Sequence, residues 1–230
     1  MKLNRVACAG AMLALMLAPG MSSRSNAASE HATPMLDAIV HFMSTVRDYS
    51  VTIDAHEVDG SEIDDRIIHF WFREPQQAKI EVVKGPAAGT RLVWTGGDKA
   101  HVRGGIFSWL PIYLDLHDSR IVSLRGNTML RAEFKPGLDC FVAHRDAVTE
   151  APGPKVDGQA TVLVTMNIPS GLNCPADSAT DHAVTRDVLT AFRSSATVVK
   201  RERYVGDTLV ERWTLSDMKF NPGLTDADFR

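Results

Sequence analysis

Hydrophobic side chains recur every three or four positions between residues 36 and 46, as they do on one face of a helix. Just before this stretch, Thr33 supplies a hydroxyl N-cap and Pro34 occupies the first helical position. Asp37 lies near the positive end of the helix dipole. These features predict an amphipathic helix that begins at Pro34 and ends at about Arg47.

From Tyr49 the spacing of apolar residues changes to two, which is typical of a strand with one buried face. Tyr49, Val51, Ile53 and Ala55 share that face, and Asp59-Gly60 is a turn signal. Further strands are expected at residues 66–73, 78–82, 92–94 and 100–103. Short strands joined by tight turns predict a consecutive antiparallel meander.

The second half of the chain is less regular. Strands are expected at residues 159–168, 197–204 and 209–215. The last two flank Gly206-Asp207 and should form a hairpin whose solvent face carries Lys200, Glu202 and Glu211. Helical segments are expected from about Gly126 to Leu138 and, unless that stretch is irregular, from about Val184 to Phe192.

The first 27 residues have the organisation of a secretory signal peptide. Lys2 and Arg5 precede an apolar stretch from Val6 to Leu17, and Ser25-Asn26-Ala27 places small residues at the −3 and −1 positions of a cleavage site. The apolar stretch is shorter than the roughly 20 residues that cross a bilayer. Cleavage after Ala27 is therefore expected to leave a single domain, residues 28–230, in the periplasm, without a transmembrane span. An uncleaved N-terminal anchor is the alternative.

The charge balance and the motif content exclude several functional classes. In 230 residues, Lys+Arg 25 against Asp+Glu 28 gives a formal charge of -3, which argues against nucleic acid because phosphates need a basic face. The histidines show no HExxH and no metal-ligand spacing, and the chain has no phosphate loop, dinucleotide fingerprint or nucleophile elbow. We therefore expect no catalytic residues, no metal and no cofactor.

Cleavage of the signal segment would leave two cysteines, Cys140 and Cys174. Two cysteines in an exported chain can pair, and closing a loop of this length stabilises by about 3–4 kcal/mol in the chain-entropy model. A disulfide and two free thiols both stay open at this point.

Apolar and aromatic side chains occur in almost every predicted strand. They are either simple core residues or the lining of a cavity, because a curved antiparallel sheet under a movable helical cover encloses space for an apolar ligand. The candidate lining residues are Val51, Ile53, Phe70, Phe72, Ile80, Val82, Leu92, Trp94 and Trp109.

Two segments carry a resemblance to a known family. In "FWFREPQQAKIEVVKGPAAGTRLVWTGGDKAHVR" (Phe70 to Arg103), a strand and a proline precede a Gly-x-x-x-Gly turn and an apolar-aromatic strand. The C-terminal "LSDMKFNPGLTDADFR" (Leu215 to Arg230) contains Asn221, Gly223, Leu224, Asp226 and Phe229. In these segments the chain resembles the outer-membrane lipoprotein carrier (LolA-like) superfamily. By its own chemistry the closing motif is expected to pin the tail onto the body.

The resemblance implies an α+β fold, an unclosed antiparallel β-barrel (half-barrel) whose concave apolar face is covered by helices. It also implies a periplasmic carrier or receptor, without a cofactor, that binds lipid or lipoprotein acyl chains in transport for outer-membrane biogenesis. Arg47 is the nearest match to the family's basic residue at the cavity mouth. The alternatives are an envelope regulatory protein that binds a protein partner with the same fold and, as a third class, an enzyme acting on lipid or envelope polymer.

Overall fold

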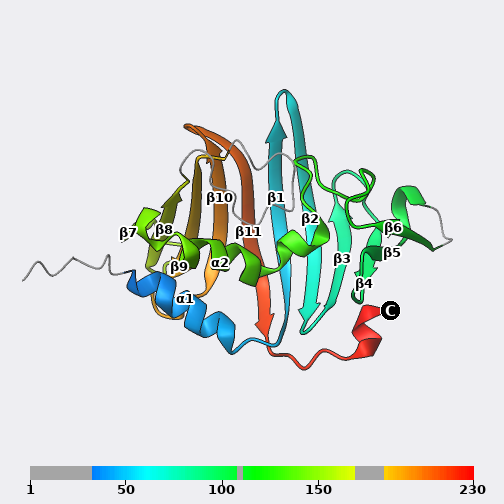
Figure 1. The fold of residues 1–230 in the computed structure, drawn as a ribbon, viewed down its shortest axis with the longest axis horizontal. Coiled ribbons are helices and arrows are strands. Elements are labelled where there is room, and N and C mark those ends of the chain that lie inside the picture. Colours follow the sequence, from blue (N-terminus) through cyan, green and yellow to red (C-terminus); the bar gives the residue numbers. More distant parts are fainter. Residues whose placement is uncertain (1–32, 108–110, 169–183) are drawn as a thin grey trace, which may run out of the picture. The chain divides into compact units, whose positions relative to one another are not determined.

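The computed structural model describes residues 33–107, 111–168 and 184–230, all within the compact unit His31–Arg230. Within these residues, eleven strands form one antiparallel sheet in the order β6-β5-β4-β3-β2-β1-β11-β10-β9-β8-β7 (Figure 1). The edge strands β6 and β7 pair only with β5 and β8, so the sheet does not close. The fold class predicted above, an unclosed β-barrel with helices, is confirmed.

Two meanders make up this sheet. The first contains β1 (Asp48–Asp59), β2 (Glu62–Arg73), β3 (Gln77–Lys84), β4 (Arg91–Trp94), β5 (Lys99–Arg103) and β6 (Ile112–Asp115). The second contains β7 (Val148–Pro152), β8 (Thr161–Asn167), β9 (Arg186–Phe192), β10 (Val198–Val205) and β11 (Thr208–Phe220). The two meanders meet where β1 pairs with β11, for example at Ile53 opposite Leu215 and Ala55 opposite Trp213.

The helices α1 (Pro34–Ser44) and α2 (Phe134–Ala143) lie over the same face of the sheet (Figure 1). Short 3-10 helices occur at η1 (Gly105–Phe107), η2 (Met129–Ala132), η3 (Arg145–Ala147) and η5 (Asp226–Phe229). α1 buries Leu36, Ile39 and Met43 towards the sheet, as its apolar spacing predicts. None of the helices in the described ranges is long and apolar enough to cross a membrane. The expected signal segment, residues 1–27, lies outside the described residues and stays a prediction.

The helix expected from about Gly126 to Leu138 begins later than predicted. Gly126 has a φ of 74° and lies in a turn, and α2 begins only at Phe134. Pro136 then falls in the first turn of α2, where a backbone N–H has no helical acceptor and its loss costs nothing. The proline is therefore compatible with a start at Phe134 and not with a helix that already passes through it.

The helix expected from Val184 to Phe192 is wrong, because this stretch forms strand β9. Its five central residues are all buried, so the period-two alternation that marks a half-buried strand is missing. β9 lies between β8 and β10 and satisfies its backbone hydrogen bonds through both neighbours. Pairing on both sides therefore decides its conformation.

The C-terminal tail is fastened to the first meander, as the closing motif predicts. Phe229 is 5% exposed, and the Arg73 guanidinium lies 5.6 Å from the centre of its ring. Arg73 also forms an ion pair with Asp226. At the other end of the tail, the Asn221 side chain accepts from the Arg47 backbone N–H at 2.7 Å and donates to the Thr45 carbonyl at 3.1 Å. The tail thus connects the end of α1 to the end of β2.

Candidate functional site

The strand register brings the predicted lining residues together in rows on the face that carries the helices. One row runs Val51, Phe70, Ile80 and Leu92 across β1 to β4. The neighbouring rows contain Ile53 with Val82, and Phe72 with Trp94. All eight residues are at most 9% exposed. Trp109 lies outside the described residues.

α1 is attached to the sheet by a carboxylate from the far edge. The hydroxyl cap expected from Thr33 is wrong, because its side chain makes no cap hydrogen bond. Instead Glu150 on β7 accepts from the backbone N–H groups of Met35 at 3.1 Å and Leu36 at 2.9 Å, which places a negative charge at the positive end of the helix dipole. The Thr33 hydroxyl accepts from Arg145 at 2.6 Å.

α2 is attached at both of its ends. Lys135 in its first turn pairs with Glu74, and Arg145, just beyond its last turn, pairs with Asp37 of α1 at 2.7 Å. From the sheet, the Tyr49 hydroxyl donates to the Ala132 carbonyl at 3.4 Å. Burial, and next the charge of Glu133, raises the pKa of Tyr49 well above its usual value, so this hydroxyl keeps its proton. Polar contacts therefore fasten the helical cover at its margins.

Two small cavities lined by described residues lie under the cover. The helix-side cavity, of about 30 Å³, lies between α1, α2 and strands β9 to β11. The loop-side cavity, of about 80 Å³, lies between residues 121–132 and strands β1 to β4, and Ile80, Val82 and Leu92 line it. Trp213 lines both cavities. Sites for drug-sized ligands measure about 300–1,000 Å³, so an acyl chain fits only when the cover moves away from the sheet.

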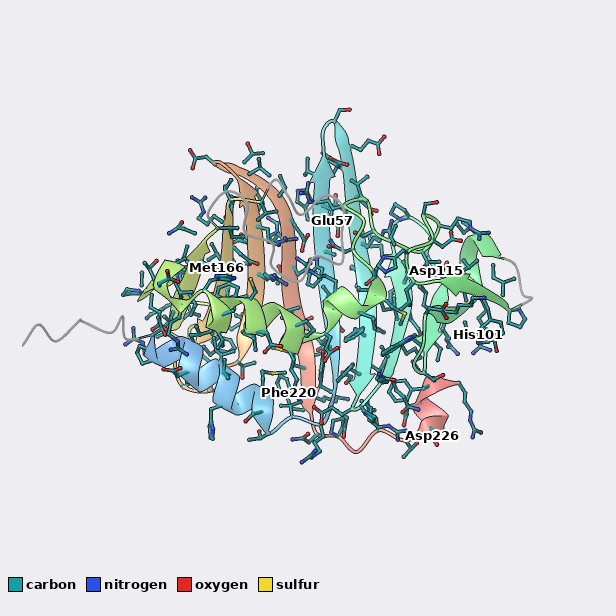
Figure 2. The ribbon with its side chains drawn as sticks, viewed as in Figure 1. Glu57, His101, Asp115, Met166, Phe220 and Asp226 are labelled. Carbon is teal, nitrogen blue, oxygen red and sulfur yellow. The ribbon has the colours of Figure 1, made fainter. Side chains whose placement is uncertain are left out.

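Buried charges lie on the same face, beyond the apolar rows. The expectation that Glu211 faces solvent is wrong: it is 1% exposed and lies opposite Glu57, which is 4% exposed. Asn127, from the segment that precedes α2, donates to both carboxylates at 3.0 Å. Glu211 also pairs with Arg203 at 3.2 Å. Figure 2 shows Glu57 towards the end of β1 remote from α1, and Phe220 beside α1.

The charges in this group influence one another. Burial, and next the charge of Glu211, raises the pKa of Glu57 above its usual value. On β10, Arg201 is paired with Asp187 of β9, at 2.6 Å between Nη2 and Oδ2. Burial would lower the pKa of Arg201, but the carboxylate of Asp187 outweighs burial and raises it. The sequence does not single out Glu57 or Arg201, and it shows Trp213 only as one of many aromatic residues in the strands. The alternation of β11 is the signal that places Glu211, Trp213 and Leu215 on one face.

The remaining predicted residues lie away from the cavities. The Arg47 side chain is 82% exposed, lies 3.5 Å from Glu74 and lines neither cavity. Cys140 is buried in α2. Cys174 lies outside the described residues, so the possible disulfide stays a prediction. In the described ranges, no group of three or more His, Cys, Asp or Glu side chains could hold a metal ion. The apolar rows on the covered face of β1 to β4 are suited to burying an apolar ligand.

No family model and no curated protein matches the chain. Solved structures do. An uncharacterized conserved protein from Thermus thermophilus is 8% identical with a TM-score of 0.50, over 85% of this chain and 90% of that one. Lipoprotein LppX from Mycobacterium tuberculosis is 15% identical with a TM-score of 0.46, and the match covers 84% of this chain and 99% of LppX. A LolA superfamily protein from Nitrosomonas europaea is 13% identical with a TM-score of 0.36, and the match covers 85% of this chain and 97% of that protein.

At identities this low, the likeness concerns the fold and not the activity. The solved structures similar to this chain include a LolA superfamily protein.

Proposed function

We propose that the protein is a periplasmic carrier or receptor for a hydrophobic ligand, an acyl chain of a lipid or lipoprotein, which it binds between the sheet and the helical cover. The observation that carries this proposal is the set of apolar rows on the covered face of β1 to β4. Burial of an acyl chain contributes about 0.8 kcal/mol per CH₂, so such a face binds lipid without any catalytic group.

Binding requires the cover to separate from the sheet. The contacts at its margins are polar, as between Lys135 and Glu74 or Glu150 and the start of α1. Such contacts are exchanged for contacts with water at a small net cost, about 0.5–1.5 kcal/mol for a hydrogen bond. The apolar surface that opening exposes would be buried again against the ligand. Opening is therefore unfavourable without a ligand and becomes favourable with one.

Lipid extraction and native mass spectrometry of the mature protein test the proposal. We expect bound acyl species, and uptake of a fluorescent hydrophobic dye by the delipidated protein. Ala132 is buried and lines the loop-side cavity, whereas Ala143, at the end of α2, is exposed. Ala132→Leu should lower dye uptake several-fold, and the matched control Ala143→Leu should leave it unchanged.

Protein that contains no lipid and takes up no dye would contradict the proposal. If, in addition, a pull-down from an envelope fraction recovered one dominant protein partner, the protein would instead be the regulatory protein considered above.

A further inference from the structure

Two side chains that carry hydrogen-bond donors, Arg201 and Trp213, line the helix-side cavity. Arg201 on β10 and Trp213 on β11 are direct partners in the β10–β11 ladder. The Arg201 side chain is 14% exposed. Most of the surrounding lining is apolar, with Met43, Phe141 and Leu215 among its members. A guanidinium in such surroundings interacts strongly with an acceptor, because little water competes for it.

Asp187 uses only part of the Arg201 guanidinium. Nε lies 3.1 Å and Nη2 2.6 Å from the carboxylate oxygens. Nη1 is directed towards α2, where Gly137, itself a lining residue, leaves space: a Cβ at that position would lie 3.3 Å from Nη1. Within the described part of the chain, Nη1 donates to no acceptor. One arm of the guanidinium thus remains available on the cavity side.

Trp213 contributes a second donor. Its Nε1 is buried and has no hydrogen-bond partner among the described residues. A buried N–H without an acceptor is costly, so native proteins seldom retain one that is not satisfied by some partner. Of the described side chains that line this cavity, three are ionisable, and two of them, Arg131 and Arg201, are cationic. Glu133 and the buried Asp187, which pairs with Arg201, balance their charge, so the two N–H donors, and not a net positive charge, favour a ligand with oxygen acceptors such as a carboxylate.

We propose that Arg201 and Trp213 bind the carboxylate head group of a long-chain fatty acid inside the half-barrel. This inference rests on the proposed function and specifies its ligand. Because Trp213 lines both cavities, the chain of such a ligand would extend past the indole towards Ile80, Val82 and Leu92 in the loop-side cavity. The head group is then enclosed, which suits a free fatty acid and not an acyl chain attached to a protein that stays outside.

A comparison of two probes tests the inference on the delipidated mature protein. A fluorescent polyene fatty acid and its methyl ester have the same chain, but only the acid carries a negative charge. We expect the wild-type protein to bind the acid about tenfold or more tightly than the ester, since hydrogen bonds to charged groups are the stronger ones. Titration of probe fluorescence at neutral pH gives both dissociation constants.

Trp213→Phe keeps an aromatic ring but removes the N–H donor together with part of the indole ring system, so binding of the uncharged ester reports the effect of the lost ring volume. Arg201→Lys keeps the positive charge and removes the planar guanidinium. Each should lower the preference for acid over ester several-fold. Trp71→Phe is the matched control: Trp71 lies on β2 between Phe70 and Phe72, and therefore on the opposite face, and should leave the preference unchanged. Circular dichroism identifies a variant that fails to fold, and Trp213→Phe decides the test if Arg201→Lys is lost in this way.

The outcomes separate the two proposals. Equal binding of acid and ester by the wild-type protein, or an unchanged preference in Trp213→Phe, overturns the head-group site and leaves the carrier function standing. If the protein binds neither the acid nor the ester, the head-group site and the carrier function are both overturned.

Discussion

Glu57 on β1 and Glu211 on β11 face each other as direct partners in the β1–β11 ladder, and Asn127 donates to both carboxylates at 3.0 Å. Two buried carboxylates this close repel each other when both are ionised. Burial first, and then the charge of Glu211, raises the pKa of Glu57. In the native state Glu57 therefore keeps its proton to a higher pH than in the unfolded chain.

We expect this pair to make the free energy of unfolding depend on pH. Because the folded pKa of Glu57 lies above its unfolded value of 4.5, the native state binds more protons than the unfolded state between these two pKa values. The contribution of Glu57 to stability therefore increases as the pH falls from above the folded pKa towards 4.5, and it is lost as the pH rises through the folded pKa. Urea unfolding at a series of pH values measures this slope.

Glu57→Gln removes the titrating group and should reduce this slope. Glu62→Gln, an exposed carboxylate at the start of β2, is the matched control and should retain the wild-type slope. Identical slopes for the wild-type protein and Glu57→Gln would show that Glu57 does not titrate differently in the folded and unfolded states.

Asn127 joins the segment before α2 to the sheet. We expect Asn127→Ala to lower the free energy of unfolding by about 1–3 kcal/mol, because it removes a donor from two buried carboxylates. Amide hydrogen exchange in residues 121–132 should also accelerate. Asn167→Ala, at an exposed position at the end of β8, is the control and should change neither quantity. Unchanged exchange in Asn127→Ala would mean that other contacts hold this segment.

Glu150 caps α1 across the fold. Glu150→Ala should cost about 0.5–2 kcal/mol of stability, in the range of a lost helix N-cap, because two backbone N–H groups lose their acceptor. Thermal unfolding and exchange of the Met35 and Leu36 amides measure the effect. The exposed Glu62→Ala is the control. Full protection of both amides in Glu150→Ala would refute the capping role.

Phe229 should contribute much of the attachment of the C-terminal tail. Phe229→Ala removes a buried ring that contacts Arg73, and we expect a loss of about 3 kcal/mol together with a lower Tm. Tyr113→Ala truncates an aromatic side chain that is 72% exposed and should have little effect. Equal effects of the two substitutions would show that the tail does not stabilise the body.

The first meander was predictable because one of its faces is buried. In β1 and β3, Val51, Ile53 and Ile80 alternate with more exposed residues, and that alternation places the apolar residues of each strand on one face. The sequence of β2 is apolar on both faces, and only its pairing with β1 and β3 places Phe70 in the row with Val51 and Ile80. β9 was not predictable in this way. All of its central residues are buried, and a fully buried stretch gives the same signal in a strand as in a helix.

The sequence by itself determined where half-buried strands run and which side of each faces the core, because the spacing of apolar residues is a local property. Only the tertiary structure decided that β1 pairs with β11, that Glu211 is buried opposite Glu57, and that Glu150 caps a helix 114 residues earlier in the chain. A charged residue is normally assigned to the surface, and whether a partner compensates its burial depends on segments that meet only after folding. The candidate head-group site is of this second kind, since Arg201 and Trp213 line one cavity only when α1 and α2 cover the strands that carry them.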